Sequence, residues 1–285
     1  VHLGHQKIIS RLNDTARATG GESVIITFWP HPRLILFPDQ KDLRLLTTFE
    51  EKAELLRVLG VQHLVKIHFT AEFSQFTSRE FIEKILINGL DTKKLIIGYD
   101  HKFGRNREGS FEHLHSNSSH YGFDVEEIPA KDIDNVNISS SRIRACLHQG
   151  DVRTAADYLG RPYALTGKVV AGDRIGRTIG FPTANIEVSS QYKMIPQQGI
   201  YAVRVSIGEN IHDGMLYIGK RPTIDNGGLK IEVNIFDFDS DIYNQDITVY
   251  FYQQIREDRR FESMEALADA LRSDKLATKQ ILKKV

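Results

Sequence analysis

The first half of the chain alternates short apolar runs with segments in which apolar residues recur every three or four positions. A continuous apolar run over residues 23–28 is typical of a buried strand. Shorter apolar runs indicate further strands at residues 63–67, 94–97 and 125–129. Because these runs alternate with segments of helical spacing, the pattern predicts a parallel sheet with helices on both faces.

Capping residues mark the ends of the helices expected in this half. Capping-box patterns at residues 48–51 and 77–80 begin two helices, and Gly60 and Gly89 are expected to end them. Two more helices are predicted before residue 160: one is capped by Ser139 or Ser140 and runs to about His148, and one is capped by Asp151 and ends at Leu159.

After residue 160 the pattern changes to closely spaced strands. They are predicted at residues 164–170, 199–207, 213–218, 230–236 and 246–253, separated by Gly, Pro, Asn and Asp. Short strands without intervening helices indicate a small β barrel or sandwich. A last helix follows, with Met264, Leu267, Ala268 and Leu271 on one face. We therefore expect two domains, residues 1–160 and 161–285.

Composition narrows the functional classes. The 285 residues include 37 basic and 37 acidic side chains, and this balance argues against bulk electrostatic binding to nucleic acid or to an anionic membrane. No apolar run reaches the roughly 18 residues of a membrane span, and no signal peptide is visible. The single cysteine, Cys146, allows no internal disulfide and fits the cytoplasm. Nothing in the sequence indicates an oligomer, and the question is left open.

The first candidate site is the run His2-Leu3-Gly4-His5, which precedes a predicted helix. Imidazoles hydrogen-bond phosphate oxygens and, if protonated, offset their charge. Gly4 allows close approach to the backbone, and a helix N-terminus favours anions. The alternative is an exposed helix cap with no ligand.

A second phosphate-binding pattern lies at residues 138–144. Hydroxyls at Ser139 and Ser140 open a helix, and the guanidinium of Arg144 follows one turn later. The alternative is a simple serine-capped helix. Together with the histidine pair, this helix start would form the two halves of a nucleotidyltransferase site.

A third pattern is the glycine-rich run at residues 167–185. Gly172, Gly176 and Gly180 form a loop whose amides could surround phosphates. Thr183 and Asn185 lie two apart, so in an extended segment their oxygens face the same way and suit Mg²⁺. The alternative is a glycine-rich hairpin followed by a turn.

These motifs together resemble a known family. HLGH with ISSSRIR resembles the HxGH/ISSTxxR adenylyltransferases. Residues 27–32 (TFWPHP) and 98–109 resemble elements of the bacterial bifunctional riboflavin kinase/FAD synthetase family, and residues 167–185 resemble its GRxxGFPTAN kinase signature. The resemblance implies a Rossmann-like nucleotidyltransferase domain followed by a small six-stranded riboflavin-kinase-type barrel with a terminal helix. It also implies two ATP-dependent reactions, riboflavin to FMN and FMN to FAD.

The resemblance implies roles for particular residues. In the adenylyltransferase it assigns the triphosphate to His2, Gly4, His5, Ser139, Ser140 and Arg144, the ATP site to Asp100, and the flavin pocket to Phe28, Pro30, His31 and Pro32. In the kinase it assigns phosphate binding to Gly172, Gly176, Gly180 and Thr183, Mg²⁺ to Thr183 and Asn185, the general base to Glu232, and flavin phosphate to Arg256. Tyr217 stands where the family commonly has Asn or Ser.

The family's opening strand and its glycine-containing turn would lie before Val1, and we expect that the gene product contains them. Two alternatives remain open. The chain could be a riboflavin kinase whose other half is inactive or acts on a different phosphate monoester. It could also be a flavin-binding sensor without turnover, although intact Thr183, Asn185 and Glu232 argue against a sensor.

Overall fold

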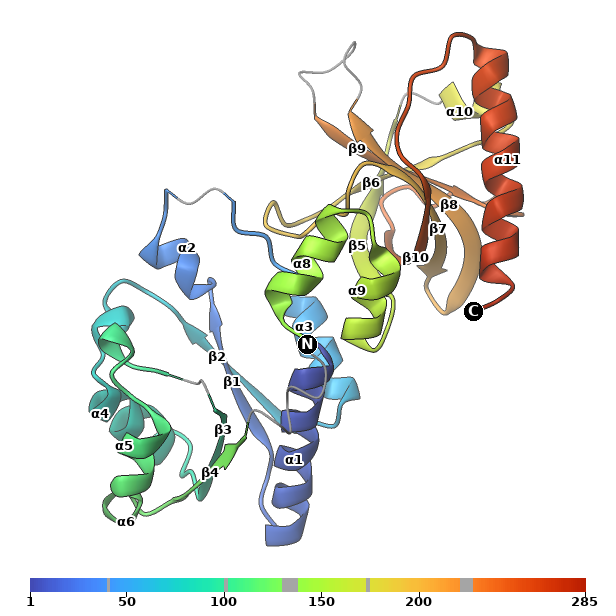
Figure 1. Ribbon diagram of the computed structural model, residues 1–285. Helices are drawn as coiled ribbons and strands as arrows, with labels where there is room; N and C mark the ends of the chain where they lie inside the picture. Colours follow the sequence, from blue (N-terminus) through green and yellow to red (C-terminus); the bar gives the residue numbers. More distant parts are fainter. Residues whose placement is uncertain (40–41, 100–101, 130–137, 173–174, 221–227) are drawn as a thin grey trace. The chain divides into compact units, whose positions relative to one another are not determined.

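The computed structural model describes residues 1–39, 42–99, 102–129, 138–172, 175–220 and 228–285. The chain forms two compact units (Figure 1). The first unit comprises residues 1–43 and 47–139, and the second comprises residues 44–46 and 140–285. Three residues of the N-terminal half thus pack with the C-terminal half.

The first unit contains two pairs of parallel strands. β1 (Val24–Trp29) pairs with β2 (His63–His68), and β3 (Lys94–Gly98) pairs with β4 (Asp124–Ile128). These four strands lie within one or two residues of the predicted apolar runs, and their parallel direction confirms the α/β prediction. Every residue of β1 is half-buried rather than buried, because within the described residues β1 is hydrogen-bonded to β2 alone.

Helices connect these strands. They are α1 (Leu3–Thr19), α2 (Pro32–Leu36), α3 (Phe49–Val58), η1 (Phe73–Gln75), α4 (Ser78–Phe81), η2 (Ile82–Ile87), η3 (Arg105–Arg107), α5 (Phe111–Ser116) and α6 (Ser118–Tyr121). Both predicted capping boxes are present; in α3 the Glu51 amide donates to Thr48 Oγ1 at 3.2 Å and the Thr48 amide donates back to Glu51 Oε2 at 3.0 Å.

The second of these helices ends beside Gly89, as predicted, because η2 ends at Ile87 and Asn88 is its C-cap residue. The residue with left-handed backbone there is Asp91, with φ 48°, not Gly89. A Cβ on Gly89 would lie 2.8 Å from the carbonyl oxygen of Ile85, so glycine permits close backbone packing at this point. A hydrophobic core cluster of the first unit is formed by Ile82, Leu86, Ile97, Leu114, Tyr121 and Phe123.

The second unit is built around a closed antiparallel barrel of six strands (Figure 1). The strands are β5 (Tyr163–Val170), β6 (Ala184–Glu187), β7 (Gly199–Ile207), β8 (Asn210–Lys220), β9 (Leu229–Ile235) and β10 (Asp246–Arg256), in the order β10-β5-β6-β9-β8-β7. The barrel confirms the prediction for this half. β6 has only four residues and ends the glycine-rich run.

Four helices of the second unit are described: α8 (Ser140–His148), α9 (Val152–Leu159), α10 (Ile175–Thr178) and α11 (Met264–Leu282). The predicted cap of α9 is present, since Asp151 accepts a hydrogen bond from the Thr154 amide at 3.0 Å. α11 lies along the barrel (Figure 1). Its buried positions are Ala270, Asp274, Thr278 and Leu282, whereas Met264 of the predicted apolar face is 44% exposed.

Candidate functional sites

In the second unit, the strand register brings three predicted kinase residues together. Asn185 in β6 lies directly opposite Glu232 in β9, so their side chains share one face of the barrel wall. Thr183 immediately precedes β6, and its hydroxyl donates to Glu232 Oε2 at 3.4 Å. The Glu232 residue is only 9% exposed. A buried carboxylate, a hydroxyl and an amide therefore converge on one side of the barrel.

The glycine-rich loop folds back onto this group. A Cβ on Gly172 would lie 2.0 Å from Asn185 Nδ2, and a Cβ on Gly176 would lie 2.2 Å from the Phe181 carbonyl oxygen. Gly180 has a left-handed φ of +79°. Each glycine therefore allows an approach or a turn that a side chain would block, and the loop lies against the segment that carries Thr183 and Asn185.

Two further residues lie beside Glu232, one on the neighbouring strand and one on its own. Tyr217 in β8 lies opposite Glu232 in the register, which places Asn185, Glu232 and Tyr217 in one row across three strands. The Tyr217 hydroxyl donates to Asp258 Oδ2 at 3.1 Å. On β9, two residues after Glu232, Asn234 Nδ2 donates to the Pro182 carbonyl oxygen at 2.6 Å. This bond holds the segment before Thr183 against β9.

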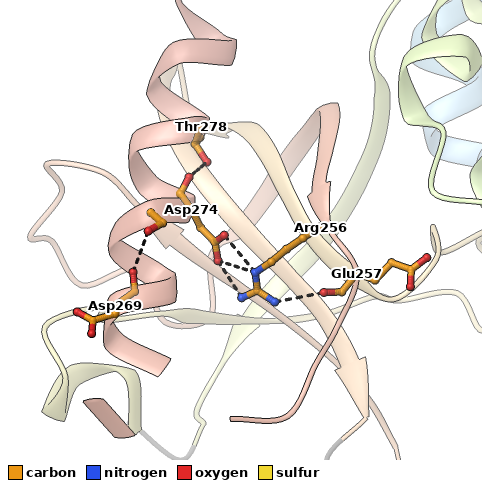
Figure 2. Close-up of polar contacts among 6 residues, drawn as sticks. Arg256, Glu257, Asp269, Asp274 and Thr278 are labelled. Carbon is orange, nitrogen blue, oxygen red and sulfur yellow. Dashed lines mark hydrogen bonds and ion pairs between the residues drawn. The ribbon is translucent and has the colours of Figure 1, made fainter. Parts of the chain in front are cut away.

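Arg256, predicted near flavin phosphate, has a different set of contacts (Figure 2). Its Nε lies 3.1 Å from both carboxylate oxygens of Asp274, and its Nη2 donates to Asp274 Oδ2 at 2.8 Å. Its Nη1 donates to the Glu257 carbonyl oxygen at 3.2 Å. Because Asp274 is 5% exposed and lies on α11, the pair fastens that helix to the end of β10. The flavin-phosphate role stays a prediction.

In the first unit, the predicted histidine pair lies at the N-terminus of α1. His2 is the N-cap residue with extended backbone, and Gly4 and His5 occupy the first turn. The main-chain amide of His2 donates to His5 Nδ1 at 3.4 Å, and the two ring centroids are 3.8 Å apart. Gly4 is buried, so the helix start is closely packed there. Both imidazoles therefore lie at the end of the helix dipole that favours anions.

Burial makes these histidines neutral near pH 7. It lowers the pKa of His2 to about 4, and the residue is 8% exposed. The pKa of His5 is lowered as well, first by burial of its ring among protein atoms and then by the positive charge of a protonated His2. The His5 residue as a whole is nevertheless exposed to solvent. Within the described residues, buried Nδ1 of His2 has no hydrogen-bond partner. The rings can thus exchange hydrogen bonds with a phosphate but bring it no positive charge.

A nearby cation that the sequence analysis missed is Lys52 on α3. Its Nζ donates to Thr27 Oγ1 in β1 at 2.9 Å, and its positive charge contributes to lowering the pKa of His5. Burial lowers the pKa of Lys52 itself. Lys52 could have been singled out by its position in the sequence, because it directly follows a capping box. It therefore lies in the first turn of a helix, where the helix dipole disfavours cations.

The predicted flavin-pocket residues lie where β1 ends. The Phe28 ring is within 5.5–6.4 Å of the rings of Phe69, Phe73 and Phe81, which the sequence analysis did not single out. The Trp29–Pro30 peptide bond is cis. His31 caps α2 by accepting from the Arg33 amide at 3.2 Å, and Pro32 is its first helical residue. An aromatic cluster thus adjoins the predicted motif.

The remaining predicted residues are distributed as follows. Ser139 is the last residue of the first unit, and Ser140 begins α8 in the second. Arg144 lies on α8, and its Nε donates to the Arg44 carbonyl oxygen at 2.6 Å. Asp100 lies outside the described residues. Since Arg144 and the histidines belong to different units, their joint action on one triphosphate stays a prediction.

Comparison with known families gives two matches in the same order as the units. The FAD synthetase family matches residues 1–142, and the riboflavin kinase family matches residues 159–282. The domain boundary predicted near residue 160 stays a prediction, because the structural units divide at residues 139 and 140 and neither family match covers residues 143–158.

Individual proteins match over the whole chain. A bifunctional riboflavin kinase/FMN adenylyltransferase of Listeria monocytogenes is 35% identical, covering 100% of this chain and 90% of that protein. One from Pseudomonas fluorescens is 34% identical, covering 99% and 89%. The solved structure of a Streptococcus pneumoniae protein named a macrolide-efflux protein has a TM-score of 0.88 and 33% identity, covering 98% and 90%.

No helix in the described ranges has both the length and the apolar character to cross a bilayer. The two family matches and the full-length relatives agree with one another and with the sequence motifs. The chain belongs to the bifunctional riboflavin kinase/FMN adenylyltransferase family.

Proposed function

We propose that the second unit phosphorylates riboflavin to FMN and that the first unit contributes the histidines that adenylylate FMN to FAD with release of pyrophosphate. The observation that carries the proposal is the convergence of Thr183, Asn185 and Glu232 on one face of the barrel, under a loop that only glycine permits. The reactions need ATP, and we place them in the cytoplasm, in keeping with the lone Cys146.

In the kinase reaction, Glu232 accepts the proton of the 5′-hydroxyl of the ribityl chain while that oxygen attacks the γ-phosphorus of ATP. The new oxygen–phosphorus bond replaces the bond to the β-phosphate, and ADP leaves. The Thr183 hydroxyl holds the carboxylate in place from 3.4 Å. A base in this role mainly orients the nucleophile, as phosphoryl transfer depends more on positioning and charge stabilisation than on covalent help.

The chemistry of the donor set fits Mg²⁺. Thr183 and Asn185 offer hard oxygens, and the absence of a Cβ at Gly172 lets the Asn185 amide occupy its place, since a Cβ there would lie 2.0 Å from Asn185 Nδ2. We therefore propose that Thr183 and Asn185 hold the ion. When bound with the nucleotide, Mg²⁺ would neutralise phosphate charge. The amides around Gly172, Gly176 and Gly180 would then surround the phosphates.

In the adenylyltransferase reaction, a phosphate oxygen of FMN attacks the α-phosphorus of ATP, and pyrophosphate leaves without any net proton transfer. Neutral His2 and His5 would hydrogen-bond the phosphates, and the buried Nδ1 of His2 would gain a partner. Because these rings carry no charge near pH 7, a cation is needed. We assign that role to Lys52, beside His5, together with Arg144.

The remaining residues of this site are proposed by resemblance. Ser139 and Ser140 would bind the triphosphate at the start of α8, Asp100 would adjoin ATP, and Phe28, Pro30, His31 and Pro32 would border the flavin. The kinase-only alternative is not favoured, because the FAD synthetase family matches residues 1–142.

Product analysis tests the proposal. The purified protein is incubated with riboflavin, ATP and Mg²⁺, and the flavins are separated by chromatography over time. FMN should appear first and FAD later, and chelation of Mg²⁺ should stop both. Accumulation of FMN without FAD would contradict the bifunctional proposal, and absence of any phosphorylated flavin would contradict the kinase as well.

A further inference from the structure

A buried lysine that neither reaction above uses lies in the second unit. Lys193 is 3% exposed, its Nζ donates to the Leu46 carbonyl oxygen at 3.0 Å, and the ammonium lies 4.8 Å from the centre of the Tyr163 ring. Removing an ammonium from water costs free energy that such contacts must offset. The Lys193 ammonium therefore supplies polar contacts that an apolar residue of similar size could not make.

Lys193 fastens a short piece of the N-terminal half. Residues 44–46, here called the strap, run beside residues 192–194 with strand-like pairing. The Leu45 amide donates to the Tyr192 carbonyl oxygen at 2.6 Å, and the Met194 amide donates to the Leu45 carbonyl oxygen at 2.8 Å. These bonds hold the middle of the strap, and Lys193 holds the carbonyl that follows.

The first carbonyl of the strap holds Arg144. Arg144 Nε donates to the Arg44 carbonyl oxygen at 2.6 Å. The helix that carries Arg144 is fixed as well, because Leu147 is fully buried and its carbonyl oxygen accepts from the Gln197 amide at 2.9 Å. The Nε bond sets the plane of the guanidinium and thus the direction of its two terminal nitrogens.

We propose that Lys193 is a positioning residue for FMN adenylylation: through the strap it orients the guanidinium of Arg144 toward the ATP triphosphate. This inference rests on the proposed function, in which Arg144 binds that triphosphate. A guanidinium binds phosphate as a planar fork, so its orientation decides whether two parallel hydrogen bonds can form. Lys193 belongs by sequence to the kinase half and acts here on the other reaction.

The test compares three variants with the wild-type chain in separate assays of the two reactions. Lys193→Met keeps an apolar stem and removes the ammonium, Lys193→Arg restores a cation, and Lys275→Met is a matched control. Lys275 also places its ammonium over a ring, that of Phe236 at 5.0 Å. Lys193→Met should raise the KM for ATP in FAD synthesis by about tenfold or more, with a smaller effect on kcat.

Riboflavin phosphorylation by Lys193→Met should stay within about twofold of the wild-type rate, Lys193→Arg should recover part of the ATP affinity, and Lys275→Met should leave both reactions unchanged. In an Arg144→Ala background, Lys193→Met should raise the KM for ATP no further, because the group it positions is gone. Equal losses in the two reactions, or additive losses with Arg144→Ala, would overturn the inference.

Amide hydrogen exchange separates this inference from the proposed function. Lys193→Met should accelerate exchange at the Leu45 amide and leave amides of the barrel strands unchanged. If the wild-type chain made no FAD, the proposed function would fail. Unchanged exchange at Leu45 would overturn the fastening role of Lys193 whether or not FAD forms.

Discussion

The hydroxyl of Thr183 donates to the carboxylate of Glu232 at 3.4 Å, joining the start of β6 to the middle of β9. Sequence places these residues far apart, and only closure of the barrel brings them together. Glu232→Gln keeps the shape of the side chain but removes the base. We expect riboflavin phosphorylation to fall by about 10²–10⁴-fold while conversion of added FMN to FAD persists. Loss of both reactions would contradict the division of labour.

A second prediction concerns the glycine-rich loop that contains Gly172. Gly172→Ala would place a Cβ 2.0 Å from Asn185 Nδ2, so either the loop or the Asn185 side chain must move. The KM for ATP in riboflavin phosphorylation should rise about tenfold or more, as measured by steady-state kinetics. Gly228→Ala is the control, because a Cβ there would lie within 4 Å of no heavy atom in the part of the chain that the structure describes. A Gly172→Ala enzyme with normal kinetics would exclude close contact with the nucleotide.

A third prediction concerns Lys52 and His5 in the synthesis of FAD from FMN. Lys52→Met and His5→Ala should each lower FAD synthesis from FMN by about 10²-fold or more, because the first removes positive charge and the second a hydrogen-bonding ring. FMN formation should be unchanged. Lys93→Met serves as control, since that ammonium pairs only at the surface, with side chains 77% and 83% exposed. Normal FAD synthesis by Lys52→Met would remove this lysine from the mechanism.

The buried ring of His2 predicts a pH dependence of stability. Burial lowers its pKa to about 4 from 6.5, so below pH 6.5 the unfolded chain takes up the proton that the folded chain resists. This contribution is therefore fully present above pH 6.5 and is lost as the pH falls toward 4. Urea unfolding should show a loss of about 3 kcal/mol across that window. His2→Gln should flatten this part of the profile, and an unchanged slope would refute the role of His2.

The Arg256–Asp274 pair makes a stability prediction that also tests flavin binding (Figure 2). Asp274→Asn leaves a largely buried guanidinium without its carboxylate and should lower the free energy of unfolding by about 2–3 kcal/mol. Asp269→Asn, which removes an exposed ion pair with Arg272, should cost no more than about 0.5 kcal/mol.

Kinetics decide whether Arg256 also serves the flavin. If it contacts flavin phosphate, Asp274→Asn should weaken FMN binding more than it slows turnover at saturating substrate. If Arg256 only fastens α11, the affinity for FMN in titrations of the folded variant should equal that of the wild type.

Strands and capped helices were predictable because each depends on neighbours in the sequence. Apolar runs located β1 to β4 to within one or two residues, and the hydroxyl of Thr48 with the carboxylate of Glu51 marked a helix start that the structure contains. β6 was harder to predict, because four residues are too few for a periodic pattern, and it becomes a strand only through pairing with β5 and β9.

Residues whose roles depend on distant partners were not predictable in the same way. Arg256 was assigned to flavin phosphate from its position in the family motif, whereas its contact with Asp274 depends on how α11 packs on the barrel. Lys52 and Lys193 were missed because single lysines have no periodicity. Their partners, Thr27 and Leu46, lie 25 and 147 residues away in the chain.

Labelled ATP shows whether one chain performs both transfers in sequence. Riboflavin and Mg²⁺ are incubated with the wild-type chain and ATP labelled at either the γ- or the α-phosphorus, and label in FMN and FAD is counted after separation. We expect γ-label in both FMN and FAD and α-label in FAD alone. Absence of α-label from every flavin product would contradict this expectation.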